Sequence, residues 1–286
     1  MSDAGLTLRS GDALGDYTVE RLLGESGLER VYLAVSSDGR HVAVKVPRFE
    51  TTTSSEFLRR FERQAATASR VSHPHVVATL DSGRLPSGVP FVVEEHVDGG
   101  SLDQLIAQRP LDIDAAVRIC NQAASGLDAL HAARIIHRNL TPACIFLDDR
   151  DGAKVGGFAL AKDRDASELT RAGHTVGAAH YIAPEQIRGQ EVTPATDVYA
   201  LGCVMYEALT GLPPFAAEKG MKVLWAHLQN PPPDPRKSRP DLPADVSWAV
   251  ARAMAKTVAE RPATATTFAR IVQIAWEGAR TRSDRG

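Results

Sequence analysis

The stretch that decides the fold reads Ile136-His137-Arg138-Asn139-Leu140-Thr141-Pro142-Ala143-Cys144-Ile145-Phe146. Each short motif of this chain is weak evidence when taken alone. Val42-Ala43-Val44-Lys45, for instance, could be a strand that ends in a surface lysine. The order of the motifs along the chain is more informative. Outward from residues 136–146, the ordered series also contains His73-Pro74, Glu95-His96-Val97-Asp98-Gly99-Gly100, Gly157-Phe158-Ala159, Tyr181-Ile182-Ala183-Pro184-Glu185, Asp197-Val198-Tyr199-Ala200-Leu201-Gly202 and Glu260-Arg261-Pro262.

Length and composition exclude several classes of protein. The chain has 286 residues, of which 43% are hydrophobic, and its formal net charge is −2. This balance argues against a nucleic-acid partner, and three cysteines are too few for a disulfide framework. We find no apolar run that would form a membrane segment and no signal-peptide core near residue 1. We therefore expect a cytoplasmic location, for this chain alone or as the cytoplasmic part of a longer membrane-anchored protein.

The pattern of the chain changes near residue 98. Before this point, short β-branched runs predict strands, together with one helix whose apolar residues recur at three and four positions. Helical periodicity dominates beyond it. We expect strands at 17–23, 31–35, 41–46, 76–80 and 91–93, and helices at 55–69, 113–131, 196–209, 246–256 and 267–276. The predicted organisation is a flexible arm at 1–15, an N-lobe at 16–97, a C-lobe at 98–276 and a basic disordered tail at 277–286.

Taken together, the ordered motifs resemble those of the eukaryotic-like Ser/Thr protein kinases of bacteria, over about residues 15–275. The resemblance implies an α+β, two-lobed protein kinase fold. Its N-lobe would contain a five-stranded antiparallel sheet and one helix, and its C-lobe would be mainly helical. A fold does not establish an activity, because activity depends on the individual residues of the site.

The nucleotide-binding positions of the family are only partly matched. The glycine-rich loop keeps Gly24 but has Ser26 and Glu29 at the other two glycine positions, and Glu29 adds a carboxylate near the expected phosphates. Lys45 matches the lysine that contacts the phosphates, whereas its usual glutamate partner is replaced by Gln64. The residues that resemble nucleotide-binding positions are Leu23, Gly24, Val31, Ala43, Lys45, Glu94, Glu95, Val97 and Phe146.

The catalytic positions of the family are substituted. Asn139 replaces the aspartate that acts as the base, and Thr141 replaces a lysine near the transferred phosphate. Cys144 and Gly157 stand at the two metal-ligand positions. A thiol is a poor ligand for Mg²⁺, and glycine has no side chain that could bind a metal. Ala178 replaces a supporting threonine. Since loss of a general base alone costs ~10²–10⁴ in rate, we expect phosphoryl transfer to be suppressed by several orders of magnitude.

One substitution suggests a new contact. The resemblance places Glu94 at the gatekeeper position, which is normally apolar or threonine. A buried carboxylate requires a partner, and the family geometry makes Lys45 the nearest candidate. We hypothesise that the two residues pair and obstruct the nucleotide, and that Phe146 narrows the adenine site further. The alternative is that a local shift of the hinge turns Glu94 into solvent. Glu62, near the expected partner position on the helix, is predicted to face elsewhere.

The positions that support the family's framework are intact. They provide a buried ion pair, an anchor for the catalytic-loop backbone and a hydrophobic spine, and they are His137, Arg138, Phe158, Glu185, Asp197 and Arg261. Thr170 resembles the activation-loop threonines that are phosphorylated in this family, with an unmodified loop threonine as the alternative.

Three functions remain open at this point. The first is a regulatory or scaffolding pseudokinase in signalling, for which neither ATP nor Mg²⁺ is expected as a cofactor. The second is a weakly active Ser/Thr protein kinase that uses ATP and Mg²⁺, with a ligand such as Asp163, Asp165 or Glu168. The third is an ATP-binding sensor without turnover. The resemblance implies an active kinase, a phosphothreonine-reading domain or a second copy of the chain as partners.

Overall fold

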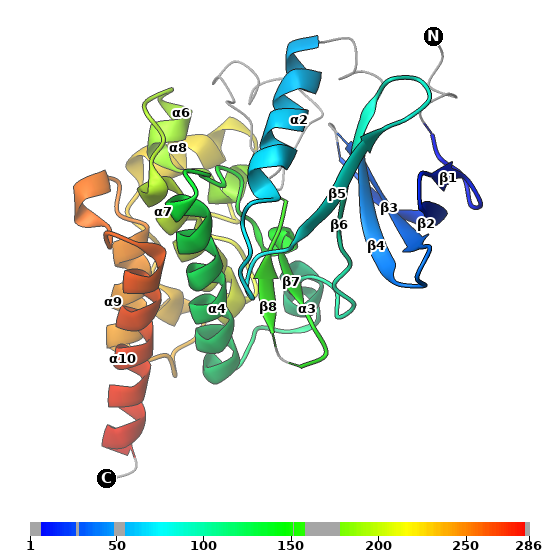
Figure 1. Cartoon of the computed structure of the whole chain (residues 1–286). Coiled ribbons are helices and arrows are strands. Elements are labelled where there is room, and N and C mark those ends of the chain that lie inside the picture. The colour runs from blue at the N-terminus through cyan, green and yellow to red at the C-terminus, as the bar shows by residue number, and fades with distance from the viewer. Residues whose placement is uncertain (1–6, 27–28, 49–54, 151, 158–177, 284–286) are drawn as a thin grey trace. The chain divides into compact units, whose positions relative to one another are not determined.

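A computed structural model describes residues 7–26, 29–48, 55–150, 152–157 and 178–283 of the chain. The chain divides into two compact units. Unit 1 comprises Met1–His73 and Val77–Asp98, and unit 2 comprises Pro74–Val76 and Gly99–Gly286. Unit 1 is rich in strands and unit 2 in helices, as expected for the predicted α+β class (Figure 1).

Unit 1 is built on a six-stranded antiparallel sheet with the strand order β1-β2-β3-β4-β6-β5. The predicted strands are present, and the two-residue strand β1 adds a sixth by pairing with β2. The strand expected at 76–80 begins later, at Thr79, because Val76 instead forms an isolated bridge with Val155. The elements of unit 1 are β1 (Ala13–Leu14), β2 (Tyr17–Glu25), β3 (Glu29–Ser36), β4 (His41–Pro47), α2 (Ser55–Ala68), β5 (Thr79–Arg84) and β6 (Pro90–Glu95).

The two faces of this sheet differ in character. Directly opposed residues on neighbouring strands share a face, so the pairing of Tyr32 with Val44 and of Val44 with Val93 places these three on one face. Each of them is at most 1% exposed, and they belong to the hydrophobic core of unit 1. The alternate residues of the same strands, including Lys45 and Glu94, lie on the opposite face. The sheet therefore combines an apolar core face with a face that carries charged side chains.

The described part of the N-terminal arm packs on the sheet. Leu14 is 3% exposed, Leu8 packs against the core of unit 1, and the backbone N–H of Gly11 donates to the Val19 carbonyl at 2.8 Å. The prediction of a flexible arm at 1–15 is therefore wrong from residue 7 onward. Burial of the two leucine side chains explains the difference, because it favours attachment of the arm to the sheet.

Unit 2 consists of helices and a small antiparallel hairpin. Helix α4 begins after Asp112, whose carboxylate accepts a hydrogen bond from the N–H of Ala115 at 2.7 Å. Helix α7 ends at Gly211, which adopts φ +80°, a left-handed conformation that favours glycine. Helices α3 and α8 are too short for the periodicity of the sequence to indicate them. The elements of unit 2 are α3 (Leu102–Gln108), α4 (Ile113–Ala132), β7 (Ile145–Leu147), β8 (Ala153–Val155), α6 (Pro184–Ile187), α7 (Pro194–Thr210), α8 (Met221–Gln229), α9 (Ala244–Ala253) and α10 (Ala265–Ser283), with short 3-10 turns at Pro142–Cys144, Ala178–Tyr181, Pro235–Lys237 and Val258–Glu260.

Helix α10 continues through most of the basic C-terminal segment. Arg280 pairs with Asp114 and Arg282 pairs with Asp245, each at 2.9 Å, and cations in the last turn of a helix are favourable. The segment predicted to be disordered from residue 277 is therefore helical as far as Ser283. Within the described parts of the chain, no helix is both long and apolar enough to span a membrane.

Candidate functional site

Lys45 and Glu94 form a buried ion pair on the charged face of unit 1. Their side chains meet with 2.7 Å between Nζ and Oε2, and the residues are 6% and 2% exposed. The register explains the contact. Ala43 pairs with Glu94 and Lys45 pairs with Val92, so Lys45 and Glu94 are diagonal neighbours on one face. The ion pair predicted from the sequence is confirmed, and the alternative of a solvent-facing Glu94 is wrong.

A second carboxylate lies on the same face. Glu29 is two residues before Val31 on β3, and Val31 pairs with Lys45. Burial raises the pKa of Glu29 to about 7; Lys45 lowers this pKa and Glu94 raises it. Glu29 Oε2 and Glu94 Oε1 are both buried, and neither has a hydrogen-bond partner among the residues that the structure describes. The carboxylates of Glu29 and Glu94 and the ammonium group of Lys45 therefore lie on one face of the sheet.

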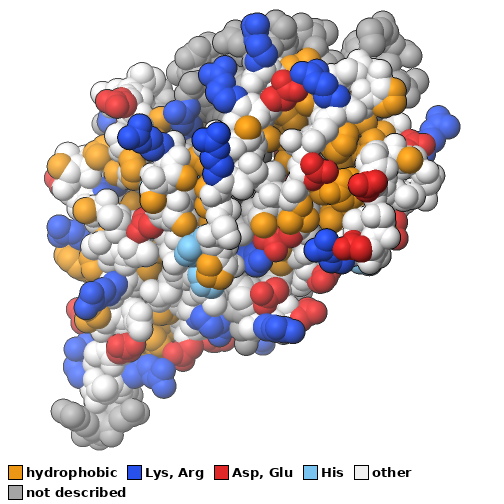
Figure 2. Space-filling view, in the orientation of Figure 1, with side chains coloured by type: hydrophobic (Ala, Val, Ile, Leu, Met, Phe, Trp, Pro, Cys, Tyr) orange, Lys and Arg blue, Asp and Glu red, His pale blue; other side chains and the backbone are white. Residues whose placement is uncertain are grey.

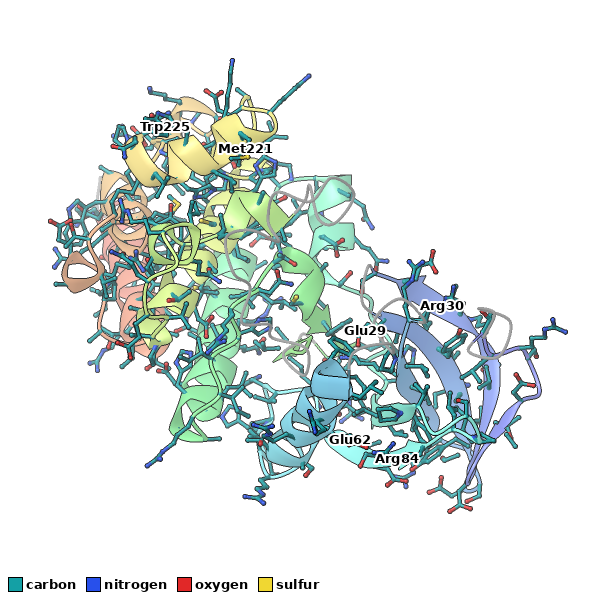
Figure 3. The ribbon with its side chains drawn as sticks, turned by 90° about the horizontal axis from the view of Figure 1, so that it is seen from above. Glu29, Arg30, Glu62, Arg84, Met221 and Trp225 are labelled. Atoms are coloured by element: carbon teal, nitrogen blue, oxygen red, sulfur yellow. The ribbon has the colours of Figure 1, made fainter. Side chains whose placement is uncertain are left out.

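Glu62 of α2 faces a different residue. Its carboxylate pairs with Arg84 of β5 at 2.5 Å, and the two side chains point toward one another (Figure 3). This agrees with the prediction that Glu62 does not face Lys45. The side chain of Gln64 lies outside the described residues. A carboxylate for Lys45 is thus supplied by β6, one strand away in the sheet.

Hydrogen bonds close the hairpin that resembles a glycine-rich loop. Gly24 pairs with Val31, and Leu23 lies at an irregularity in the pairing of β2 with β3. The N–H of Ser26 donates to the Glu29 carbonyl at 2.8 Å, and the N–H of Glu29 donates to Ser26 Oγ at 3.2 Å. The two residues that replace glycines therefore hold the ends of this hairpin to each other.

The residues that follow Glu94 leave the charged face. Glu95 pairs with Val42, on the core side of the sheet, and its Oε1 accepts a hydrogen bond from the N–H of Ala78 at 2.8 Å. Val97 lies in the segment between β6 and the end of unit 1. Phe146, the last predicted nucleotide residue, is half-buried on β7 in unit 2. That these residues bind a nucleotide remains a prediction.

In unit 2, Asp197 holds the backbone that follows α4. Its two carboxylate oxygens accept hydrogen bonds from the N–H groups of His137 and Arg138, each at 2.8 Å. Arg138 has φ 63°, a conformation that is unfavourable for a non-glycine residue. The two hydrogen bonds therefore stabilise a strained turn. The anchor predicted for Asp197 is confirmed.

His131 extends this anchor, and the sequence analysis did not identify it. Its Nε2 lies 2.7 Å from Asp197 Oδ2, and its Nδ1 lies 3.5 Å from Asp128 Oδ1. Burial by itself would lower the pKa of His131, but hydrogen bonds to Asp128 and Asp197 raise it to about 9. Asp128 also accepts hydrogen bonds from the N–H groups of Ala265 and Thr266 at the start of α10. A charged imidazole thus links α10 to the anchored loop. A histidine three residues after an aspartate on one helix is the sequence signal that could have indicated the contact with Asp128, because such residues are neighbours on the helix surface.

The substituted catalytic and metal positions lie together in unit 2. Gly156 donates its N–H to the Cys144 carbonyl at 2.8 Å, and a Cβ added at Gly157 would lie 3.2 Å from Cys144 Sγ. Cys144 Sγ also lies 3.4 Å from the Asn139 carbonyl and 3.5 Å from Thr141 Oγ1. The four positions identified from the sequence are therefore spatial neighbours.

This group of residues does not fit Mg²⁺. Burial tends to raise the pKa of Cys144, but hydrogen bonds from His137 and Thr141 lower it overall. A thiol is a soft ligand, whereas Mg²⁺ prefers carboxylate and water oxygens. Among the residues that the structure describes, no group of three or more His, Cys, Asp or Glu side chains could hold a metal ion.

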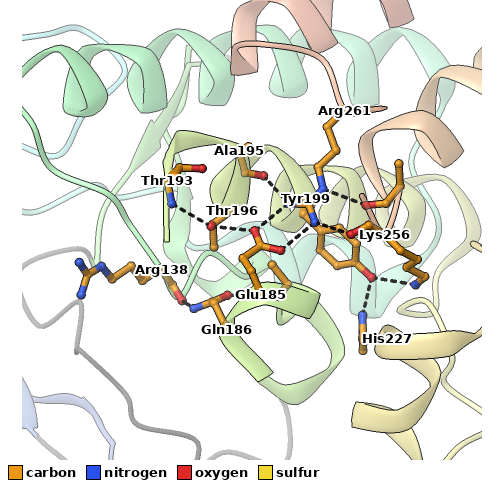
Figure 4. Close-up of polar contacts among 12 residues, drawn as sticks. Arg138, Glu185, Gln186, Thr193, Ala195, Thr196, Tyr199, His227, Lys256 and Arg261 are labelled. Atoms are coloured by element: carbon orange, nitrogen blue, oxygen red, sulfur yellow. Dashed lines mark hydrogen bonds and ion pairs between the residues drawn. The ribbon is translucent and has the colours of Figure 1, made fainter. Parts of the chain in front are cut away.

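Glu185 and Arg261 form the second predicted ion pair (Figure 4). The guanidinium donates to both carboxylate oxygens, at 2.7 and 2.8 Å, and Thr196 Oγ1 donates to Glu185 Oε1 at 2.8 Å. Burial would raise the pKa of Glu185, but the contact with Arg261 lowers it. The same guanidinium lies 4.9 Å from the centre of the Tyr199 ring. The predicted pair is confirmed.

Lys256 belongs to the same region and was missed by the sequence analysis. Its Nζ donates to Tyr199 Oη at 3.2 Å and lies 4.9 Å from the centre of the Phe215 ring. Burial lowers the pKa of Lys256 to about 8. Tyr199 Oη also bonds to His227 Nδ1 at 2.8 Å. Arg261 and Lys256 thus contact one carboxylate, backbone carbonyls and aromatic rings.

Several predicted residues lie outside the described part of the chain. They are Phe158, Asp163, Asp165, Glu168 and Thr170. Ala178 begins the first described turn after them. On the molecular face shown in Figure 2, basic and acidic side chains are interspersed and do not gather into one large patch.

A family model described as a protein kinase domain matches residues 17–276. The chain belongs to the protein kinase family. It is 37% identical to the serine/threonine-protein kinase pkn3 of Myxococcus xanthus over 265 residues, or 88% of this chain and 48% of the relative. It is 39% identical to the serine/threonine-protein kinase PknD of Mycobacterium tuberculosis over 264 residues, or 91% of this chain and 39% of the relative. The chain thus spans less than half the length of these relatives.

Solved structures agree with this assignment. The kinase domain of Mycobacterium tuberculosis PknI is 28% identical, with a TM-score of 0.75 over 94% of this chain and 100% of that chain. A structure of Rad53 in complex with AMP-PNP is 22% identical, with a TM-score of 0.75 over 90% of this chain and 65% of that chain, which supports the fold alone. The two-lobed kinase fold predicted from the sequence is confirmed.

Proposed function

We propose that this protein kinase domain acts as a regulatory or scaffolding pseudokinase. The observation that carries the proposal is the group formed by Asn139, Thr141, Cys144 and Gly157, which contains neither a carboxylate base nor a carboxylate ligand. Phosphoryl transfer depends mainly on positioned charges and metal ions. A kinase domain whose catalytic charges are replaced by a thiol, an amide and a glycine would bind partners without transferring phosphate.

The charged face of unit 1 supports the same proposal. In the family the lysine at this position contacts phosphates, whereas Lys45 here is 2.7 Å from the buried Glu94. Separation of the pair would leave an uncompensated buried charge, which costs ~3–5 kcal/mol. We propose that Glu94, at the gatekeeper position of the expected nucleotide site, obstructs nucleotide binding, and that Phe146 contributes.

The obstruction can be tested by replacing both residues. We expect Glu94→Met combined with Phe146→Leu to increase the affinity for ATP, measured by calorimetry. Because Lys45 loses its partner in this variant, its fold is checked by circular dichroism. A folded variant whose ATP affinity equals that of the parent would show that Glu94 and Phe146 do not obstruct the site.

A second candidate function is a weakly active Ser/Thr protein kinase. The relatives favour it directly, because pkn3 and PknD are both named serine/threonine-protein kinases and are 37% and 39% identical to this chain. Such an enzyme would use ATP and Mg²⁺, and it would require a metal ligand and a base other than the residues at positions 139, 144 and 157. An ATP sensor without turnover is intermediate between these two functions, because it would bind ATP but would not transfer phosphate.

Thermal unfolding with ATP, alone and with Mg²⁺ or Mn²⁺, separates these functions. A ligand at about 100 times its Kd stabilises by ~2.7 kcal/mol, or roughly 5–10 °C for a chain of this size. For a pseudokinase whose cleft is obstructed, we expect ATP to cause no shift in the unfolding temperature. A shift with ATP that does not depend on the metal indicates an ATP sensor. A metal-dependent shift with transfer of labelled phosphate to a protein would establish the active kinase and overturn the pseudokinase proposal.

The proposed partners follow from the proposed pseudokinase function. We propose an active kinase that phosphorylates Thr170, and a phosphothreonine-reading domain that binds the product; a second copy of this chain is a further candidate. Incubation with an active relative should place phosphate on the 163–180 segment, as detected by mass spectrometry. Absence of phosphate there would count against this role of Thr170. We also propose a cytoplasmic location, within a longer protein or alone.

A further inference from the structure

Lys256 of unit 2 carries a half-buried amine without a carboxylate partner. Its Nζ donates to Tyr199 Oη at 3.2 Å (Figure 4) and to the Ala226 carbonyl at 3.5 Å. Among the residues that the structure describes, no carboxylate forms an ion pair with this amine, and the two charged side chains that act on it, Arg261 and Arg188, are both cations. A buried ammonium group normally requires a neighbouring anion. This position therefore disfavours the charged form of the amine.

Two aromatic rings flank the same amine. The Nζ atom of Lys256 lies 4.9 Å from the centre of the Phe215 ring and 5.5 Å from the centre of the Tyr199 ring. Phe215 has φ 60°, which is unfavourable for a bulky residue, and its ring packs edge-on against His227 with 5.0 Å between the ring centres. Backbone strain of this kind is concentrated at functional sites. The rings place apolar surface beside the nitrogen, and such an environment activates a lysine as a nucleophile.

The Lys256 amine is the group of this cluster that titrates near neutral pH. Burial and the two arginines lower its pKa to about 8, although Cys203 acts in the opposite direction. Burial raises the pKa of Cys203 and of Tyr199 and lowers that of His227 to about 3, so these three groups stay neutral between pH 6 and pH 10. The arginines stay charged. About half of the Lys256 amine is therefore neutral at pH 8, compared with about 0.3% for a lysine of ordinary pKa.

We propose that Lys256 is a site of covalent acylation by a small acyl phosphate. The neutral amine attacks the carbonyl carbon, and an N–C bond forms. The bond between this carbon and the phosphate oxygen breaks, phosphate leaves with the bonding electrons, and the nitrogen releases one proton to water. A small donor suits a half-buried nitrogen, and an anionic donor suits a nitrogen whose charged neighbours are both arginines.

The product of this reaction is a neutral amide, so the modification removes a positive charge from the cluster. The inference is independent of the proposed pseudokinase function, because it involves neither unit 1 nor the substituted positions 139, 141, 144 and 157.

The basicity of the amine sets the size of the expected effect. Relative to a lysine of ordinary pKa, the neutral fraction of Lys256 at pH 8 is about 150 times larger. A less basic nucleophile is intrinsically slower, by about tenfold over this interval if amines follow the dependence of thiols. Lys256 should therefore be acylated roughly tenfold faster at pH 8 than an exposed lysine.

The test is acetylation of the whole chain with acetyl phosphate, followed by peptide mass spectrometry. Lys222, which is exposed on α8, is the reference lysine in the same protein. Lys256 should react roughly tenfold faster than Lys222 at pH 8. This ratio should fall by more than about tenfold at pH 10, because a lysine of ordinary pKa still loses its proton over this range. Unfolding in urea should abolish the difference, because it removes the aromatic neighbours.

Arg188→Gln tests the choice of an anionic donor, and Arg188 is exposed. This variant should slow the acetylation of Lys256 by acetyl phosphate more than that by p-nitrophenyl acetate, an uncharged donor, because a change in the pKa of the amine affects both reagents in the same direction. Equal slowing would overturn the assignment of an acyl phosphate. Acetylation of Lys256 no faster than that of Lys222, an unchanged ratio at pH 10, or the same difference in urea would overturn the nucleophilic site itself.

Discussion

Arg261 holds Glu185 through two parallel hydrogen bonds, at 2.7 and 2.8 Å, at a site where the arginine is 5% and the glutamate 3% exposed. The same guanidinium donates to the Ala195 and Ala255 carbonyls, at 2.9 and 2.8 Å. It therefore connects the short helix α6, the start of α7 and the segment after α9. This ion pair is a structural centre of unit 2.

Arg261→Met should destabilise the protein by ~3–5 kcal/mol, because it leaves the Glu185 carboxylate buried without its cation. The free energy of unfolding in urea measures this. Arg280→Met is the matched control, since Arg280 and Asp114 are 57% and 60% exposed and such pairs contribute ~0–1 kcal/mol. Equal losses in the two variants would contradict the importance assigned to the buried pair.

The pair of Lys45 and Glu94 should show strong energetic coupling. Lys45→Met and Glu94→Met each leave one buried charge uncompensated, and each should cost ~3–5 kcal/mol. The double variant should be more stable than either single one, because it removes both charges, and a coupling energy of at least ~1 kcal/mol is expected. Urea unfolding of the four proteins measures the coupling. Additive losses would show that the two side chains act independently.

The fold was predictable because most of its determinants are local or ordered along the chain. Alternation and periodicity indicated β4 and α4 to within about two residues. Strand β1 was missed because two residues give no alternation pattern, although it pairs with the neighbouring β2. The start of the N-terminal arm and the helical C-terminal segment were mispredicted because they are stabilised by contacts with residues far away in the sequence, such as those of Leu8 with Tyr32, of Arg280 with Asp114 and of Arg282 with Asp245. Local composition carries no information about such partners.

The candidate site was predictable where the resemblance supplied a geometry, as for Lys45 with Glu94 and for Asp197 with the loop backbone. It was not predictable where side chains are brought together by tertiary packing alone. His131 with Asp197 and Lys256 with Tyr199 are such cases, because their partners are 66 and 57 residues distant. The sequence also could not show that Glu29 and Glu94 retain buried oxygens without donors, since this depends on side-chain rotamers.

His131 should make stability depend on pH. Its pKa is about 9 in the folded protein and 6.5 in an unfolded chain, so the stabilisation is fully present below pH 6.5 and is lost as the pH rises through 9. The difference corresponds to about 3 kcal/mol at ~1.36 kcal/mol per pKa unit. The lowered pKa of Lys256 acts in the opposite direction above pH 8. The measurement is therefore the difference in unfolding free energy between parent and His131→Gln, which should shrink from pH 6 to pH 10. A constant difference would contradict the assignment.

Restoring the family's ligands at positions 144 and 157 tests the hypothesis that Cys144 and Gly157 prevent the binding of Mg²⁺. Gly157 has φ +77°, and a new Cβ would lie 3.2 Å from Cys144 Sγ. Gly157→Asp alone should therefore destabilise by ~1–2 kcal/mol through backbone strain. In combination with Cys144→Asn it would provide the oxygen ligands that Mg²⁺ prefers.

The gain is measured in the Glu94→Met/Phe146→Leu background, where the cleft is expected to accept ATP. Addition of Gly157→Asp and Cys144→Asn should make the thermal shift with ATP depend on Mg²⁺. Gly157→Ala with Cys144→Asn is the matched control, because alanine also adds a Cβ at this positive φ and provides no carboxylate. A Mg²⁺-dependent shift in this control, or in the unmodified protein, would show that the metal is held by other residues and that the chain retains a route to catalysis.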